Sequence, residues 1–235
     1  MLLRMLRSGN ADLFSVIIYI LSTLLTIFLV LPLHECAHGF VAYKLGDDTA
    51  KREGRITLNP LKHINYFGAA LMLLIGFGWA EPVPVDPRNF KNPKAGMAIT
   101  AFAGPLSNML AAIVAGLLSN TVVLLYSKEI MPAGPVIGKY HLIIYILLFF
   151  EFLIRINVGL AVFNFIPIPP LDGSKILMAV LPDRLIMSIA VFERYISIGL
   201  FVLIMMGGLN GILDAATGVM YNFVAWLTWL PFSWI

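Results

Sequence analysis

The residues with the clearest chemical potential are two histidines and a glutamate in the segment His34-Glu35-Cys36-Ala37-His38, which has the pattern HExxH. Residues four apart lie on one face of a helix, so the imidazoles of His34 and His38 can bind one zinc ion together. The Glu35 carboxylate would then lie beside the activated water as its general base. Because ionisable side chains next to a long apolar run are costly unless something compensates them, a metal site is favoured over a packing role.

A third ligand is expected elsewhere in the chain, because a catalytic zinc ion keeps three protein ligands and one open position. Cys36 lies two positions after His34 and therefore faces away from it on a helix. Asp172 follows three prolines in the segment 164–173 (NFIPIPPLDG), where a helix must break, and broken backbone at membrane depth lines polar cavities. Asp172 is therefore the expected third ligand. The candidates inside or bordering the apolar runs are Cys36, Glu81, Glu151, Asp172, Glu193 and Asp214.

The composition places these residues in an integral membrane protein. Of the 235 residues, 60% are hydrophobic and only 12% are charged, whereas about 25% are charged in a typical soluble domain. The mean hydropathy is +0.89. This composition excludes a soluble globular enzyme, a disulfide scaffold and a disordered tail protein.

The apolar runs define the expected elements, since a helix needs about 20 residues to cross the hydrocarbon core. Four runs pass easily, and the last pair predicts either two spans or one span and a surface helix. The run at 68–80 would cover only about 20 Å as a helix, which predicts a re-entrant or interfacial segment. The runs lie at 13–33, 68–80, 95–126, 142–168, 185–209 and 212–230.

The expected fold class is an all-α membrane protein. It is a polytopic transmembrane bundle of about five to six helices with a short β-hairpin or re-entrant segment. A short strand is expected at Gly54–Leu58 (GRITL), where polar and β-branched residues alternate. Glu151 and Arg155, in the middle of the run at 142–168, are spaced i, i+4, which favours a salt bridge over a proton relay. His63 is expected to cap a hairpin or lie at the surface instead of binding metal.

The distribution of basic residues predicts the orientation. Eight of them lie between the runs at 13–33 and 95–126, and the positive-inside rule places this cluster in the cytoplasm. If the run at 68–80 does not cross the membrane, His34, His38 and Asp172 all fall on the cytoplasmic side. The cluster consists of Lys44, Lys51, Arg52, Arg55, Lys62, Arg88, Lys91 and Lys94. Its first part, 44–62, is expected to touch lipid headgroups and not nucleic acid.

HECAH at the end of an early apolar helix, followed by NFIPIPPLDG, resembles the two signatures of the site-2 protease family of intramembrane zinc metalloproteases. Asn164, Pro167 and Pro169 are in register with the second signature, which ends in Leu171-Asp172-Gly173. GRITLNPLKHI, FGWAEPVPVDP and the segment 103–108 (AGPLSN) also resemble the compact members, which lack PDZ and CBS domains. Glu81 departs from the family, many members of which carry a lysine there.

The resemblance implies that His34, His38 and Asp172 hold one Zn²⁺ per chain and that Glu35 activates the water. It implies an endopeptidase that cuts a single-pass transmembrane protein within or near the lipid bilayer of the cell membrane, as in regulated intramembrane proteolysis. One transmembrane protease domain, 1–235, is expected, with a catalytic core at 11–180 and C-terminal transmembrane helices at 184–232. Cleavage requires an extended substrate, and GRITL and the 68–84 region are the candidate edges for β-augmentation.

Two asparagines are further candidates for the site. Asn108, in the third run, can bond across helices or hold the water or the oxyanion, and the family motif favours a catalytic role. Asn164 can equally cap broken backbone near the prolines or touch the substrate carbonyl.

Other classes of function remain open at this level. A metal-ion carrier would explain the paired histidines but not Glu35, and the internal repeats typical of carriers are not visible. A catalytically silent regulator would not need Glu35. The other membrane HExxH proteases take a ligand from a glutamate with an acidic residue four positions later, whereas Arg155 follows Glu151 and Ser197 follows Glu193.

Overall fold

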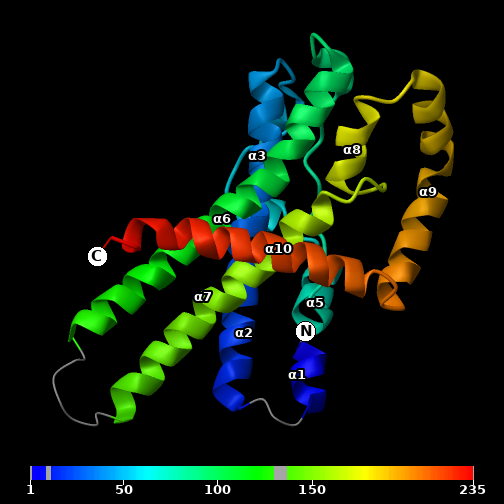
Figure 1. The fold of residues 1–235 in the computed structure, drawn as a ribbon. Coiled ribbons are helices and arrows are strands. Elements are labelled where there is room, and N and C mark those ends of the chain that lie inside the picture. Colours follow the sequence, from blue (N-terminus) through cyan, green and yellow to red (C-terminus); the bar gives the residue numbers. More distant parts are fainter. Residues whose placement is uncertain (1, 9–11, 130–136, 235) are drawn as a thin grey trace.

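The computed structural model describes residues 2–8, 12–129 and 137–234, and within them every regular element is a helix (Figure 1). The long apolar runs of the sequence become the long helices, and the proline- and glycine-rich stretches become their connections. In chain order the elements are α1 (Leu2–Ser8), α2 (Leu13–Leu25), η1 (Thr26–Val30), α3 (Leu31–Lys44), α4 (Thr49–Arg52), η2 (Pro60–Lys62), α5 (Tyr66–Ile75), η3 (Pro87–Asn89), α6 (Pro93–Glu129), α7 (Ile137–Asn164), α8 (Asp172–Met178), α9 (Asp183–Met205), α10 (Asn210–Trp229) and η4 (Leu230–Phe232).

Four helical stretches among the described residues are long and apolar enough to cross a membrane, which confirms a multi-pass membrane protein. The first of them joins α2, the π-helical turn η1 and α3 into one continuous helix. The expected count of five to six helices is not confirmed, because α10 is not among these four. They are Leu13–Lys44, Pro93–Tyr126, Leu142–Asn164 and Asp183–Met205.

The short apolar run folds back on itself, as a re-entrant segment must. Asn65 caps α5 by accepting the Gly68 N–H at 2.9 Å, and Gly76 ends the helix in the left-handed conformation with φ 82°. The chain then returns extended, so that Ile64 and Ala80 form an antiparallel bridge. The return lies so close to α5 that a Cβ on Gly78 would be 2.1 Å from the Gly68 carbonyl oxygen. Both ends of the segment therefore lie at the same level, and it does not cross the bundle.

The strand expected at Gly54–Leu58 does not form. These residues occupy turns and bends, and the one β-bridge among the described residues joins Ile64 to Ala80. The segment finds no neighbouring strand to pair with, and its half-buried Ile56 packs against α3 near Gly39. Alternation of side chains alone cannot make a strand without such a partner.

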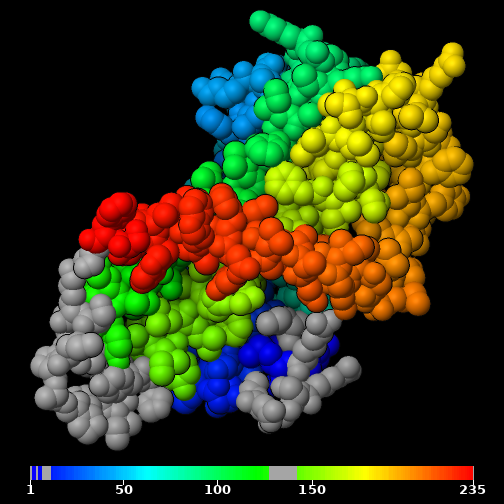
Figure 2. Space-filling view, in the orientation of Figure 1, coloured from blue at the N-terminus to red at the C-terminus, as the bar shows by residue number. Residues whose placement is uncertain are grey.

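The centre of the bundle lies between α6 and α7, which cross beside α2, α3 and α10 (Figure 1). Small residues of α6 pack against aliphatic residues of α7 there, with Val224 of α10 fully buried. Figure 2 shows α10 lying across the outer faces of α6 and α7, with α9 at the edge of the molecule. The Glu151–Arg155 salt bridge expected from the i, i+4 spacing forms on α7.

Candidate metal centre

The two histidines of the HExxH segment project together from α3. The helix runs through Leu31–Lys44 without a break, so the four-residue spacing brings both rings to one face. Both are almost fully buried, and their Nε2 atoms lie 3.1 Å apart. The helix geometry expected for this motif is therefore present.

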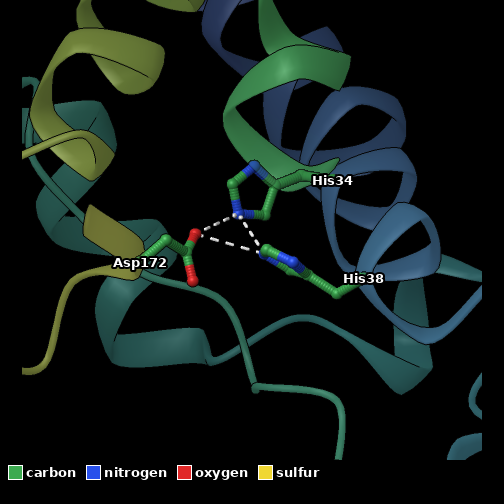
Figure 3. A group of neighbouring side chains, drawn as sticks. All are labelled: His34, His38 and Asp172. Atoms are coloured by element: carbon green, nitrogen blue, oxygen red, sulfur yellow. Dashed lines mark hydrogen bonds and ion pairs between the residues drawn. The ribbon is translucent and has the colours of Figure 1, made fainter. Parts of the chain in front are cut away.

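Asp172 reaches the same point from a distant part of the chain, as Figure 3 shows. Pro169 and Pro170 end the irregular connection after α7, and Asp172 is the first residue of α8. Its Oδ2 lies 3.4 Å from His34 Nε2 and 3.2 Å from His38 Nε2. Ligand atoms of the three side chains lie within 4.8 Å of one another, and all three residues are buried. Two imidazoles and a carboxylate form a donor set that fits a catalytic zinc ion.

The backbone of α6 orients one of the imidazoles. His38 Nδ1 lies 2.7 Å from the Thr100 carbonyl oxygen, which can only accept a hydrogen bond. Nδ1 must therefore carry the proton, which leaves the lone pair of Nε2 directed toward His34 and Asp172. Metal-binding histidines usually have such a partner for their second nitrogen. The donor chemistry of the site, taken from its own contacts, therefore fits a metal ion.

Gly104 allows α6 to approach the two rings closely. A Cβ at this position would lie 2.3 Å from His38 Nε2 and 2.6 Å from His34 Cε1, closer than any side-chain carbon can stand. Thr100 and Gly104 lie one turn apart and form the wall behind the imidazoles. Neither contact was predicted from the sequence; the only signal was that Gly104 belongs to the small-residue segment 103–108 that resembles the family.

Glu35 is held beside the metal-binding group by the backbone of the extended segment that follows α5. Its Oε2 accepts a hydrogen bond of 2.9 Å from the Val83 N–H, and the residue is buried. The carboxylate is thus fixed next to His34 without contributing an atom to the three-residue cluster. This is where a general base for a metal-activated water is needed.

One cavity of about 420 Å³ is lined by His34, Glu35, His38 and Asp172. Its other walls are mainly apolar and aromatic, and they come from the re-entrant segment, α6, α7 and α9. Apolar lining with a few convergent polar groups is typical of a substrate site. Representative lining residues are Phe77, Trp79, Met97, Phe163, Leu200 and Phe201.

The two candidate asparagines lie in different surroundings. Asn164 lines the cavity, and its Nδ2 donates to the Leu160 carbonyl within α7. Asn108 is fully buried, outside the residues that line the cavity, and neither its Oδ1 nor its Nδ2 has a partner among the described residues. Their roles in catalysis stay predictions. His63 is buried at the base of the re-entrant segment, where its carbonyl accepts the Glu81 N–H, and it lies outside the metal-binding group.

The structure combines helices that can span a membrane with a buried His-His-Asp group beside a glutamate. This combination is typical of a membrane protein with a hydrolytic metal site. Residues 131–206 match the model of peptidase family M50. The chain is also 40% identical over 177 residues to the Bacillus subtilis (strain 168) protein named "Putative zinc metalloprotease YwhC", covering 75% of each chain. No solved structure gives a significant match.

The chain belongs to peptidase family M50, the site-2 protease family, and is a membrane zinc metalloprotease. The resemblance drawn from HECAH and NFIPIPPLDG is thereby confirmed. The family implies zinc, and His34, His38 and Asp172 are the described residues that can hold it.

Proposed function

We propose that this metalloprotease hydrolyses peptide bonds in transmembrane segments of single-pass membrane proteins, within or near the bilayer. The observation that carries the proposal is the joining of His34, His38 and Asp172 with Glu35 on one largely apolar cavity among helices that can span a membrane. A site for soluble peptides would not need such surroundings. An apolar helix, once unwound, presents side chains that match these walls.

In the proposed reaction, His34, His38 and Asp172 hold one Zn²⁺ per chain. The ion supplies Lewis-acid polarisation of the scissile carbonyl and lowers the pKa of water. The Glu35 carboxylate accepts a proton from the attacking water and returns it to the leaving amine. Asn108 and Asn164 are the proposed candidates for holding the water or the substrate carbonyl.

The substrate must be extended at the site, because a helical peptide bond is hydrogen-bonded and shielded. With the GRITL strand absent, the extended return 79–85 is the candidate edge that remains for β-augmentation. It lines the cavity beside Glu35, which supports this assignment.

We propose further that the site faces the cytoplasm. The His-His-Asp group joins α3 to α8, both of which pack on α6, and the connections between α3 and α6 carry most of the basic cluster 44–94. The positive-inside rule assigns such connections to the cytoplasm.

The metal assignment is tested by measuring zinc per chain in detergent-purified wild type, His34→Ala and Asp172→Ala. About one zinc ion is expected in the wild type, and loss is expected in both variants, because each removes one of three ligands. Zinc that is unaffected by Asp172→Ala would place the third ligand elsewhere and overturn the site.

The role of Glu35 is tested by Glu35→Gln, which keeps the shape of the side chain but cannot accept the proton. Zinc should stay at the wild-type level, while cleavage of an apolar reporter peptide should fall at least a thousandfold, within the range that loss of general-base catalysis allows, roughly 10²–10⁴-fold. Retained cleavage would contradict the general-base assignment.

A further inference from the structure

The hydrogen bond between Val83 and Glu35 depends on where the extended segment 81–86 lies. Pro82 and Pro84 have no N–H, so Val83 offers the one backbone donor between Glu81 and Val85. A shift of this segment along α3 would therefore withdraw the donor from Glu35 without replacing it. The contacts that fix segment 81–86 therefore also determine whether the Glu35 carboxylate keeps its hydrogen bond from Val83.

Asp47 fixes one end of the segment. Its side chain is completely buried just after α3, and its Oδ2 accepts the Asp86 N–H at 2.8 Å. Its Oδ1 accepts hydrogen bonds from Asn89 Nδ2 at 2.8 Å and from the N–H and hydroxyl of Thr49. One carboxylate thereby ties the loop after α3 to the loop that leads into α6.

Arg55 fixes the other end. Its Nη2 donates to the carbonyl oxygens of Glu81 at 2.8 Å and Pro82 at 3.0 Å. The Glu81 N–H in turn donates to the His63 carbonyl at 2.7 Å, which ties the segment to the residues that precede α5. The two residues directly before Val83 are therefore held through their backbone.

Gly39 allows the middle of the segment to lie directly on α3. A Cβ at Gly39 would be 3.1 Å from Val83 Cγ1, and Gly39 is one helical turn after Glu35. The Val83 side chain is buried there, which brings its N–H level with the glutamate. The contacts of Asp47, Arg55 and Gly39 thus together fix the position of the Val83 N–H.

We propose that Asp47 and Arg55 are positioning residues for Glu35, acting through the backbone of residues 81–86. This inference rests on the proposed role of Glu35 as general base. Neither side chain belongs to the metal-binding group or lines the cavity. Each holds one flank of the segment so that the Val83 N–H orients the carboxylate toward the attacking water.

The test compares Asp47→Asn and Arg55→Ala with the wild type. In Asp47→Asn, an NH₂ group replaces one carboxylate oxygen. At least one of the groups that donate a hydrogen bond to Asp47 then faces a second donor, and its hydrogen bond is lost. We expect kcat on a fluorescence-quenched apolar peptide in detergent to fall between roughly ten- and a hundredfold, the scale expected for a misplaced catalytic group. The KM should stay within twofold, and zinc per chain should stay at the wild-type level.

The exposed pair Asp48 and Arg52 provides the matched control. These residues lie close to Asp47 and Arg55 in sequence, and among the described residues their side chains bond only to each other, in an i, i+4 salt bridge. Asp48→Asn and Arg52→Ala should leave kcat within twofold of the wild type. Arg55→Lys, which keeps a donor for one carbonyl, should recover part of the activity lost in Arg55→Ala.

Hydrogen exchange separates positioning from general loss of structure. Amides of residues 81–86 should exchange at least tenfold faster in Asp47→Asn and Arg55→Ala, while amides of α6 and α7 should keep their wild-type rates. Wild-type kcat in both variants, with cleavage still abolished in Glu35→Gln, would overturn the inference and leave the proposed function standing. Cleavage retained in Glu35→Gln would instead overturn the general base itself. Loss of zinc together with faster exchange throughout α6 would show a merely structural role.

Discussion

At the scale of single residues, the metal-binding group depends on atoms that carry no charge. The Thr100 carbonyl fixes the proton of His38, and the missing side chain of Gly104 makes room for both rings. The Val83 N–H holds Glu35. A substitution at Gly104 can therefore weaken metal binding without altering a proposed ligand.

Gly104→Ala is expected to lower zinc retention at least tenfold against a chelator such as EDTA. The new methyl group would overlap the His38 ring, so the imidazoles or α6 must move apart. Gly159→Ala is the matched control, because a Cβ there meets nothing within 4 Å and the residue also lies on a long apolar helix, α7. Equal zinc retention in the two variants would contradict the close approach of α6.

The meeting of His34, His38 and Asp172 could be predicted from the sequence because their signals are local. The HExxH spacing needs only a helix, and Asp172 follows a proline-rich break that is visible in the chain. The contacts of Thr100, Gly104 and Val83 could not be predicted, since each joins segments more than forty residues apart. They depend on how α3, α6 and the re-entrant return pack, which no local pattern encodes.

At the scale of elements, the same distinction explains the error at Gly54–Leu58. The pattern of the segment fits a strand, but a strand also needs a partner, and the partner is a tertiary property. The fold-back of the run at 68–80 was predictable because this run is too short to span a membrane. The i, i+4 pair of Glu151 and Arg155 was predictable because α7 itself provides both partners.

Asp47, which joins two loops, is expected to make stability depend on pH. Burial raises the pKa of this carboxyl, but hydrogen bonds from Thr49, Asn89 and the Asp86 backbone outweigh it and hold the pKa below its ordinary value of 3.8. Because the folded pKa is lower than the unfolded one, the stabilisation is complete above about pH 4 and is lost as the pH falls through the folded pKa. Between pH 5 and pH 3 the Tm of the wild type should therefore fall more steeply than that of Asp47→Asn. Parallel Tm profiles would contradict this expectation.

The contact between α7 and α10 has a polar centre that can be measured. Tyr221 donates its hydroxyl to Glu151 at 2.5 Å, and the Arg155 guanidinium lies 4.3 Å from the Tyr221 ring centroid. A double-mutant cycle of Glu151→Gln and Tyr221→Phe should give a coupling free energy of about 0.6–1.7 kcal/mol, the range known for hydrogen bonds between membrane helices. Tyr195→Phe, at an exposed tyrosine of α9, should show no coupling to Glu151→Gln when thermal unfolding is measured in detergent.

At the scale of the whole molecule, the return of the re-entrant segment sets which surfaces face the same side. If the segment 64–80, whose ends Ile64 and Ala80 are paired, does not cross the membrane, the loop after α3 and the start of α9 should lie on one side of it and the end of α9 on the other. The orientation expected from the basic cluster 44–94 requires this arrangement. The arrangement can be tested without any substrate.

Single cysteines can report on which side of the membrane each connection lies. Suitable exposed positions, in a Cys36→Ser background, are Glu53, Val180 and Met206. In sealed inverted vesicles a membrane-impermeant maleimide should label Glu53→Cys and Val180→Cys, and it should label Met206→Cys only after detergent is added. Labelling of Glu53→Cys and Val180→Cys from opposite faces would overturn both the orientation and the closure of the site.

The length of α6 connects the molecule to the thickness of its membrane. Its 37 residues extend about 55 Å, whereas the hydrocarbon core is about 30 Å thick. The helix must therefore tilt or project beyond the lipid tails, and a change in acyl-chain length alters that tilt. Thr100 and Gly104 lie on this helix behind the two imidazoles, so the hydrophobic mismatch between helix and bilayer acts on the same helix that supports the proposed zinc ligands.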